Sequence, residues 1–184
     1  MAIDPNVLRT VLHSPESRDV TESPIVTAVI LSDPANAIDL VPALEQADTI
    51  ESTNARRILC QFGAEAAPYL TKTLRNGGLN ARKEGVEILW SMLLGENSWV
   101  VRDTLNQIAS DLFVLLDDKR PLPDRMPTHI ERDFRGRICD LTFIVVQQLI
   151  DSRYDQSEFR SLDDKGRDEY ITRLKDRGFG LAIS

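Results

Sequence analysis

The chain has 184 residues, of which 42% are hydrophobic, 28% charged and 6% aromatic, and its formal net charge is −7. This length suits a single domain spanning residues 1–184, and the composition excludes a disordered or low-complexity chain. No apolar run approaches the roughly 20 residues of a membrane-spanning helix, and the N-terminus lacks the basic and then apolar order of a signal peptide. We therefore expect a cytoplasmic protein with no membrane association.

Negative charge is concentrated near the N-terminus, where residues 1–50 hold eight acidic side chains against Arg9 and Arg18. Such a terminus disfavours nonspecific binding to phosphate backbones and anionic membranes, because both require local positive charge. The two cysteines, Cys60 and Cys139, lie in apolar helical patterns. We expect them to be buried core residues that do not form a disulfide.

Two short helices are expected before residue 34. Asp4 is a typical N-cap and Pro5 suits the first helical position, which predicts a helix over about 5–13. Pro15 ends this helix, because the residue before a proline is displaced from the helical region. Ser23-Pro24 begins a second helix with four aliphatic residues, Ile25, Val26, Val29 and Ile30.

The segment from 34 to 117 is predicted to form helices that meet in pairs. Apolar residues at helical spacing indicate helices over about 34–47, 51–62, 64–76, 80–94 and 99–116. Pro42 lies inside the first, so that helix either kinks there or gives way to a new one near Leu40. The run from Val86 to Leu94 is apolar on most sides, which predicts a helix that is covered on both faces.

Residues 55–70 resemble the HEAT-like repeat family, in particular the short bacterial variety related to phycobilisome-lyase repeats, through the run Ala55-Arg56-Arg57-Ile58-Leu59-Cys60-Gln61-Phe62-Gly63-Ala64-Glu65-Ala66-Ala67-Pro68-Tyr69-Leu70. Pro42 and Pro68 occupy matching positions at an offset of 26 residues, a period typical of helical repeats. The resemblance covers about 34–117. It implies an all-α, right-handed stack of antiparallel helix pairs, an α-solenoid, that presents a surface to a partner and is mostly noncatalytic.

The C-terminal third is predicted to close this stack. A proline-rich connection over 121–127 leads to a long helix from Thr128 to about Arg153, and a last helix follows over about 163–177. The domain is thus expected to consist of N-terminal capping helices over 1–33, a HEAT-like core over 34–117, C-terminal capping helices over 128–177 and a tail over 178–184. Phe179 and Leu181 in that tail must dock on the chain itself or on a partner.

Six basic residues are candidates for a partner surface around the turn at 76–80: Arg56, Arg57, Lys72, Arg75, Arg82 and Lys83. Stacked helices could gather them into a basic strip, although scattered exposed charges explain them better. Trp99 begins a helix and could anchor a partner, whereas Trp90 is expected in the core. For Trp99 too, core packing is the favoured prediction, because tryptophan is usually well buried.

Catalytic patterns are weak throughout the chain. His129, Glu131 and Asp133 could share one helix face, but Asp133 and Glu131 are each four residues from an arginine, and a solvated helix start with ion pairs explains the group. No metal-ligand spacing, phosphate-binding loop or nucleophile elbow is present. We therefore expect no metal and no cofactor.

The leading functional hypothesis is a noncatalytic protein–protein interaction, scaffold or adaptor module that binds another protein or forms a homo-oligomer. The second is a nucleic-acid-binding protein that uses the strip from Arg56 to Lys83. The third is a small lyase-type enzyme, as the family resemblance suggests, with Cys60, His129 and Glu131 as its candidate groups.

Overall fold

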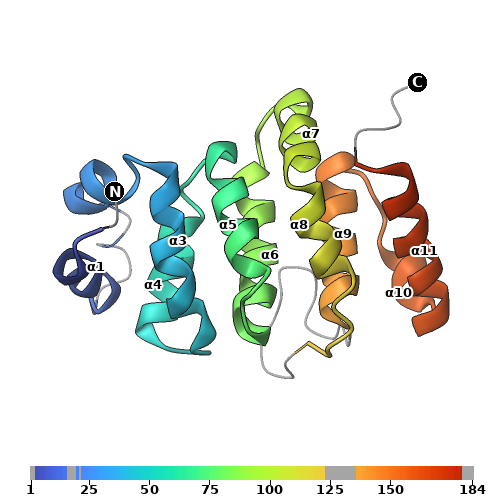
Figure 1. Cartoon of the computed structure of the whole chain (residues 1–184), viewed down its shortest axis with the longest axis horizontal. Helices are drawn as coiled ribbons and strands as arrows, with labels where there is room; N and C mark the ends of the chain where they lie inside the picture. The colour runs from blue at the N-terminus through green and yellow to red at the C-terminus, as the bar shows by residue number, and fades with distance from the viewer. Residues whose placement is uncertain (1–2, 16–19, 21, 123–135, 180–184) are drawn as a thin grey trace.

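The computed structural model describes residues 3–15, 20, 22–122 and 136–179 (Figure 1). Helices are the only regular elements in these ranges, and an isolated antiparallel bridge joins Pro121 to Arg137. The all-α class is therefore confirmed. Within the same ranges, no helix has the length and apolar character needed to cross a membrane.

The first two helices show one prediction confirmed and one revised. Helix α1 spans Pro5–Leu12, and the Asp4 side chain accepts a hydrogen bond from the backbone N–H of Asn6 at 2.8 Å. In the second predicted helix, residues 24 and 25 are α-helical and lead into a π-helix, η1, spanning Val26–Ile30. Its wider turn buries Val26 and Ile30 and leaves their two aliphatic neighbours exposed.

Pro42 divides the helix that was predicted over 34–47. The segment consists of the 3-10 helix η2 (Pro34–Asn36), helix α3 (Ala37–Leu40) and the 3-10 helix η3 (Val41–Glu45). Proline has no N–H to continue the α-helical ladder, and of the two predicted alternatives the structure shows the second, a new helix that begins at Val41, next to Leu40.

The next helices lie close to their predicted bounds. They are α4 (Ile50–Leu59), the 3-10 helix η4 (Ala64–Ala66), α5 (Ala67–Leu74) and α6 (Leu79–Leu93). Helix α6 is covered on both faces, as predicted, because it packs on α5 and η3 as well as on α9. Gly85 allows α5 to pack closely on α6, since a Cβ there would lie 2.4 Å from Leu74 Cδ1.

The single helix predicted over 99–116 is wrong. The chain forms α7 (Ser98–Gln107) and α8 (Ala109–Leu116), with Ile108 between them at φ −97° and ψ 6°. Ile108 is only 1% exposed, so its packing in the core holds the backbone at this break although no glycine or proline is present.

The long helix predicted from Thr128 begins later. Helix α9 spans Ile138–Ile150, and Gly136 and Arg137 before it are not helical. The backbone N–H groups of Ile138 and Cys139 donate to carbonyls in the 118–120 segment instead. Residues 128–135 of that prediction, His129 and Glu131 included, lie outside the described residues.

Two helices complete the described chain. Helix α10 (Ser157–Ser161) was not predicted, whereas α11 (Asp164–Arg177) matches its prediction and ends at Gly178, whose φ is 68°. Phe179 then folds back and is 1% exposed, with its ring centroid 5.4 Å from that of Phe113 on α8. Phe179 therefore docks on this chain, and Leu181 lies outside the described residues.

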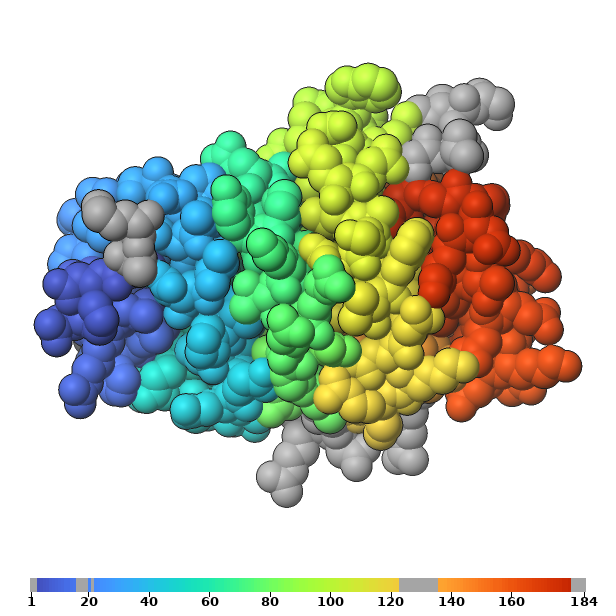
Figure 2. All heavy atoms as spheres, viewed as in Figure 1, coloured from blue at the N-terminus to red at the C-terminus, as the bar shows by residue number. Residues whose placement is uncertain are grey.

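The helices lie in two rows (Figure 1). Helices α3, α5, α8 and α11 form the front row in this view, and α4, α6 and α9 lie behind them. Neighbours pack both along and between the rows, for example α5 on α6 and α8 on α9. The hydrophobic core lies between the rows, and α7 projects beyond the other helices at the upper edge (Figures 1 and 2).

Candidate partner-binding edge

The six basic residues do not form an unpaired strip. Arg56 bonds to Glu84 and, at 2.8 Å, to Glu87, and Lys83 Nζ lies 2.7 Å from Glu84. Lys83 is only 3% exposed. Lys83 is therefore corrected from a candidate surface residue to a buried one that ties α6 into an ionic cluster with α4.

Two of the four remaining cations of the strip are also neutralised. Arg82 lies 2.7 Å from Asp118, and Arg75 lies 3.0 Å from Asp111. Arg57 and Lys72 are exposed and make no ion pair with a residue in the described ranges. Four of the six cations are therefore paired with carboxylates of the same chain. This pairing lowers the positive electrostatic potential that phosphate binding requires.

Two buried carboxylates, those of Asp118 and Asp140, form ion pairs with arginines of the same chain. Burial raises the pKa of Asp118, but hydrogen bonds from Arg120 and Arg82 outweigh it and lower that pKa to about 2. Asp140 is fully buried and accepts hydrogen bonds from Arg137 and from Arg167 at 3.2 Å. Asp118 thus joins α6 to the segment that follows α8, and Asp140 joins α9 to α11.

Neither thiol has the environment of a nucleophile. Burial raises the pKa of Cys139 to about 12 and also raises that of Cys60. Thiolate is the reactive form of cysteine, and these shifts disfavour it. Over the described ranges, no group of three histidine, cysteine or carboxylate residues could hold a metal ion.

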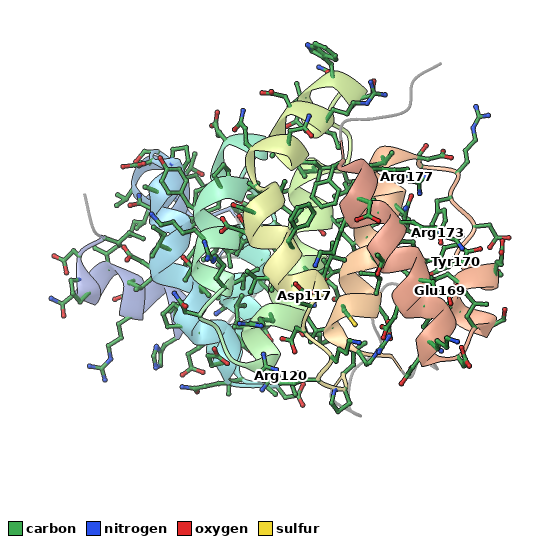
Figure 3. All side chains as sticks on the ribbon, turned by 45° about the vertical axis from the view of Figure 1, so that its right-hand side comes forward. Asp117, Arg120, Glu169, Tyr170, Arg173 and Arg177 are labelled. Atoms are coloured by element: carbon green, nitrogen blue, oxygen red, sulfur yellow. The ribbon has the colours of Figure 1, made fainter. Side chains whose placement is uncertain are left out.

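On the exposed side of helix α11, Arg173 and Arg177 make their contacts within the helix (Figure 3). The Arg173 guanidinium lies 5.4 Å from the Tyr170 ring centroid and 3.9 Å from Glu169, and Arg177 donates to the Arg173 carbonyl. A shallow hollow of about 340 Å³ beside them is lined by Tyr170, Arg173, Asp176 and Arg177. Its mixed charges and internal bonds give it no clear ligand.

Trp99 is the most exposed large apolar side chain in the described ranges, at 76%, and Leu94 follows at 60%. The favoured prediction of core packing for Trp99 is wrong, whereas Trp90 is partly buried against the core as expected. The cause is helical geometry. Val101 and Leu105 turn into the core, and a residue two positions before Val101 points about 200° away from it.

An open groove is lined by Val100, the residue after Trp99, and by Glu96, two residues after Leu94. Its volume is about 560 Å³, and its lining comes from the η4–α5 segment on one side (Gly63, Ala64, Glu65 and Pro68) and from α7 and its preceding turn on the other (Glu96, Val100, Thr104 and Gln107). The walls come close at one end, where a Cβ on Gly63 would lie 3.6 Å from Glu96 Oε1. We call this the η4–α7 groove, and together with Leu94 and Trp99 it forms the α7 edge.

Comparisons with protein-family models, with curated proteins and with solved structures found no match. The HEAT-like resemblance therefore stays a prediction based on residues 55–70. The candidate site rests on the geometry of the α7 edge.

Proposed function

We propose that this chain is a noncatalytic protein-binding module, built as a right-handed HEAT-like stack of helix pairs, that holds another protein at the α7 edge. The observation that carries the proposal is the 76% exposure of Trp99 beside an open groove. The two rows of helices support the stacked arrangement, since the helices within each row lie side by side (Figure 1).

Exposure of these side chains has a free-energy cost that a partner would remove. Fully burying a large apolar side chain contributes about 1.5–3 kcal/mol. Trp99 and Leu94 are mostly exposed on the isolated chain, so they gain only a small part of this free energy on folding. Leucines of the core, in contrast, are completely buried. Tryptophan is also among the residues that dominate binding energy at protein interfaces.

The test compares two positions of similar character. A photo-crosslinking phenylalanine analogue replaces Trp99 in one variant and Ile50 in the other, because Ile50 is 54% exposed and begins α4, at the far end of that helix from the groove. We expect position 99 to capture a defined protein in lysate of the source cells and position 50 not to. Equal capture at both positions, or no capture at either, would contradict the proposal.

A second pair of variants measures the contribution of the tryptophan. Trp99→Ala should weaken binding of the captured protein by about ten-fold or more, as expected for an interface anchor. Ile50→Ala should leave it unchanged. Both variants should keep the helical circular dichroism of the parent chain, since neither residue is buried.

A further inference from the structure

The η4–α7 groove is acidic. Glu65 and Glu96 are the charged residues of its lining, one from each wall, and the other lining residues are neutral. Both carboxylates belong to exposed residues. Neither forms an ion pair with any residue of the described ranges, so their charge is available to a ligand.

Nearby carboxylates differ in this respect. Asp111 pairs with Arg75, and the Glu84 and Glu87 carboxylates pair with Arg56. Ion pairs thus neutralise these carboxylates of α6 and α8, whereas within the described ranges Glu65, Glu96 and also Asp103 on α7 have none; Asp103 accepts a hydrogen bond from Gln107 at 2.7 Å. An unneutralised pair on facing walls is complementary to positive charge.

The groove also has apolar surface beside its charges. Val100 and Pro68 line its two walls, and Trp99 precedes Val100 on α7. A ligand that fills the groove and reaches Trp99 therefore needs apolar as well as cationic groups. Lysine and arginine suit such a place, because their aliphatic stems cover apolar surface while the charged ends reach carboxylates.

We propose that the η4–α7 groove binds a cationic segment of the partner protein, with a lysine or arginine side chain between Glu65 and Glu96 and an apolar neighbour against Trp99. This inference rests on the proposed function and names the chemistry of the partner. A second copy of the chain is the poorer occupant, because a two-fold interface at this edge would bring the acidic walls of both copies together.

The direct test uses three short acetylated and amidated peptides as probes, one of alternating leucine and lysine, one of alternating leucine and glutamate, and one of alternating serine and lysine. Binding is measured by calorimetry at low and at physiological salt. We expect the leucine–lysine peptide to bind best, the serine–lysine peptide weakly and the leucine–glutamate peptide not at all. Equal binding of the two leucine peptides would overturn the cationic assignment.

The variants assign the binding to the groove. Glu65→Gln with Glu96→Gln should weaken the leucine–lysine peptide by about two- to thirty-fold and flatten its salt dependence, because two exposed ion pairs are lost. The matched control, Glu22→Gln with Asp176→Asn, removes the same charge from exposed residues outside the groove lining and should bind as the parent does. Equal weakening in both double variants would place the attraction in the net charge and refute the site.

The two proposals fail in different ways. If position 99 crosslinks a partner whose contacting segment is acidic or uncharged, the cationic inference is overturned and the protein-binding function stands. If position 99 captures no partner, the function itself is contradicted. A captured segment with lysine or arginine next to an apolar residue, whose binding the groove variants weaken, supports both.

Discussion

Gly85 is predicted to be a site where one methyl group destabilises the chain despite improving the helix. It lies within α6, and an added Cβ would be 2.4 and 2.5 Å from the two δ-carbons of Leu74 and 2.9 Å from its Cγ. Leu74 is completely buried on α5, so its side chain has no solvent to move into. This contact sets the spacing of α5 and α6, and α5 carries one wall of the groove.

The expected magnitude follows from two opposing effects. Favourable carbon–carbon contacts lie at about 3.5–4.0 Å, so the new methyl group would overlap Leu74 by roughly 1 Å. Overpacking of this kind costs about 1–3 kcal/mol, while replacing glycine by alanine within a helix gains about 1 kcal/mol. Because the overlap involves three atoms of an immobilised side chain, we expect Gly85→Ala to lower the free energy of unfolding by about 1–2 kcal/mol.

The assay is urea unfolding followed by helical circular dichroism, on Gly85→Ala, Leu74→Ala and the double variant. Leu74→Ala alone should cost about 2–5 kcal/mol, because it leaves a cavity. In that background Gly85→Ala has space for its methyl group and should stabilise the chain by about 1 kcal/mol. The coupling free energy between the two positions is therefore expected to be about 2–3 kcal/mol.

The sign change is the decisive result. If Gly85→Ala destabilises the Leu74→Ala background as much as it destabilises the parent, the effect does not arise from this contact. If it stabilises the parent, α5 and α6 can separate without loss, and the close approach is not a constraint on the fold. A shift of the midpoint at constant denaturant slope is needed for either conclusion.

Three further predictions concern buried contacts. Arg120 and Arg82 lower the pKa of Asp118 to about 2, so its ionised carboxylate contributes about 2 kcal/mol to the free energy of unfolding above pH 4. This contribution is lost as the pH falls from about 4 to about 2. The urea midpoint of Asp118→Asn should therefore fall less than that of the parent chain over this pH range. Asn54→Ala removes two hydrogen bonds, to the backbone carbonyls of Leu12 at the end of α1 and of Ser14 after it, and should cost about 1–3 kcal/mol, with faster amide exchange in α1. Phe179→Ala should cost about 3–5 kcal/mol in the same urea assay, because its ring is buried, and an unchanged midpoint would contradict its docking on this chain.

Local signals predicted most of the helices. Asp4-Pro5 marked the start of α1, Pro42 marked the change from α3 to η3, and Gly178 marked the end of α11. Each of these residues restricts or frees its own backbone, or caps its own helix, so neighbouring residues suffice to predict its effect. Apolar residues spaced three and four positions apart predicted the other helices.

Features set by distant contacts could not be predicted in this way. The start of α9 depends on backbone hydrogen bonds with the 118–120 segment, and α10 is held by Phe159, whose ring stacks on Phe143 at 4.3 Å. The ion-pair partners of the basic residues could not be predicted from the sequence either. Arg75 meets a carboxylate 36 positions away, and Arg56 meets carboxylates 28 and 31 positions away.

The candidate site lies on α7, whose separation from α8 was also not predicted. With α7 ending before Ile108, three stripes of the helix face three different surroundings. Val101, Leu105 and Ile108 are buried, and Val100, Thr104 and Gln107, each one residue earlier, line the groove, although Thr104 is also buried. A shift of one residue turns a helical side chain by about 100°, so the groove stripe lies beside the core stripe. Trp99, one residue earlier again, lies on the far side from the core.

Each stripe repeats at spacings of four and three residues. The hydrophobic pattern therefore identified the buried stripe but gave no information on the other two. Function at this edge would then depend on residues that the core does not constrain, with the core stripe acting only to hold α7 in place.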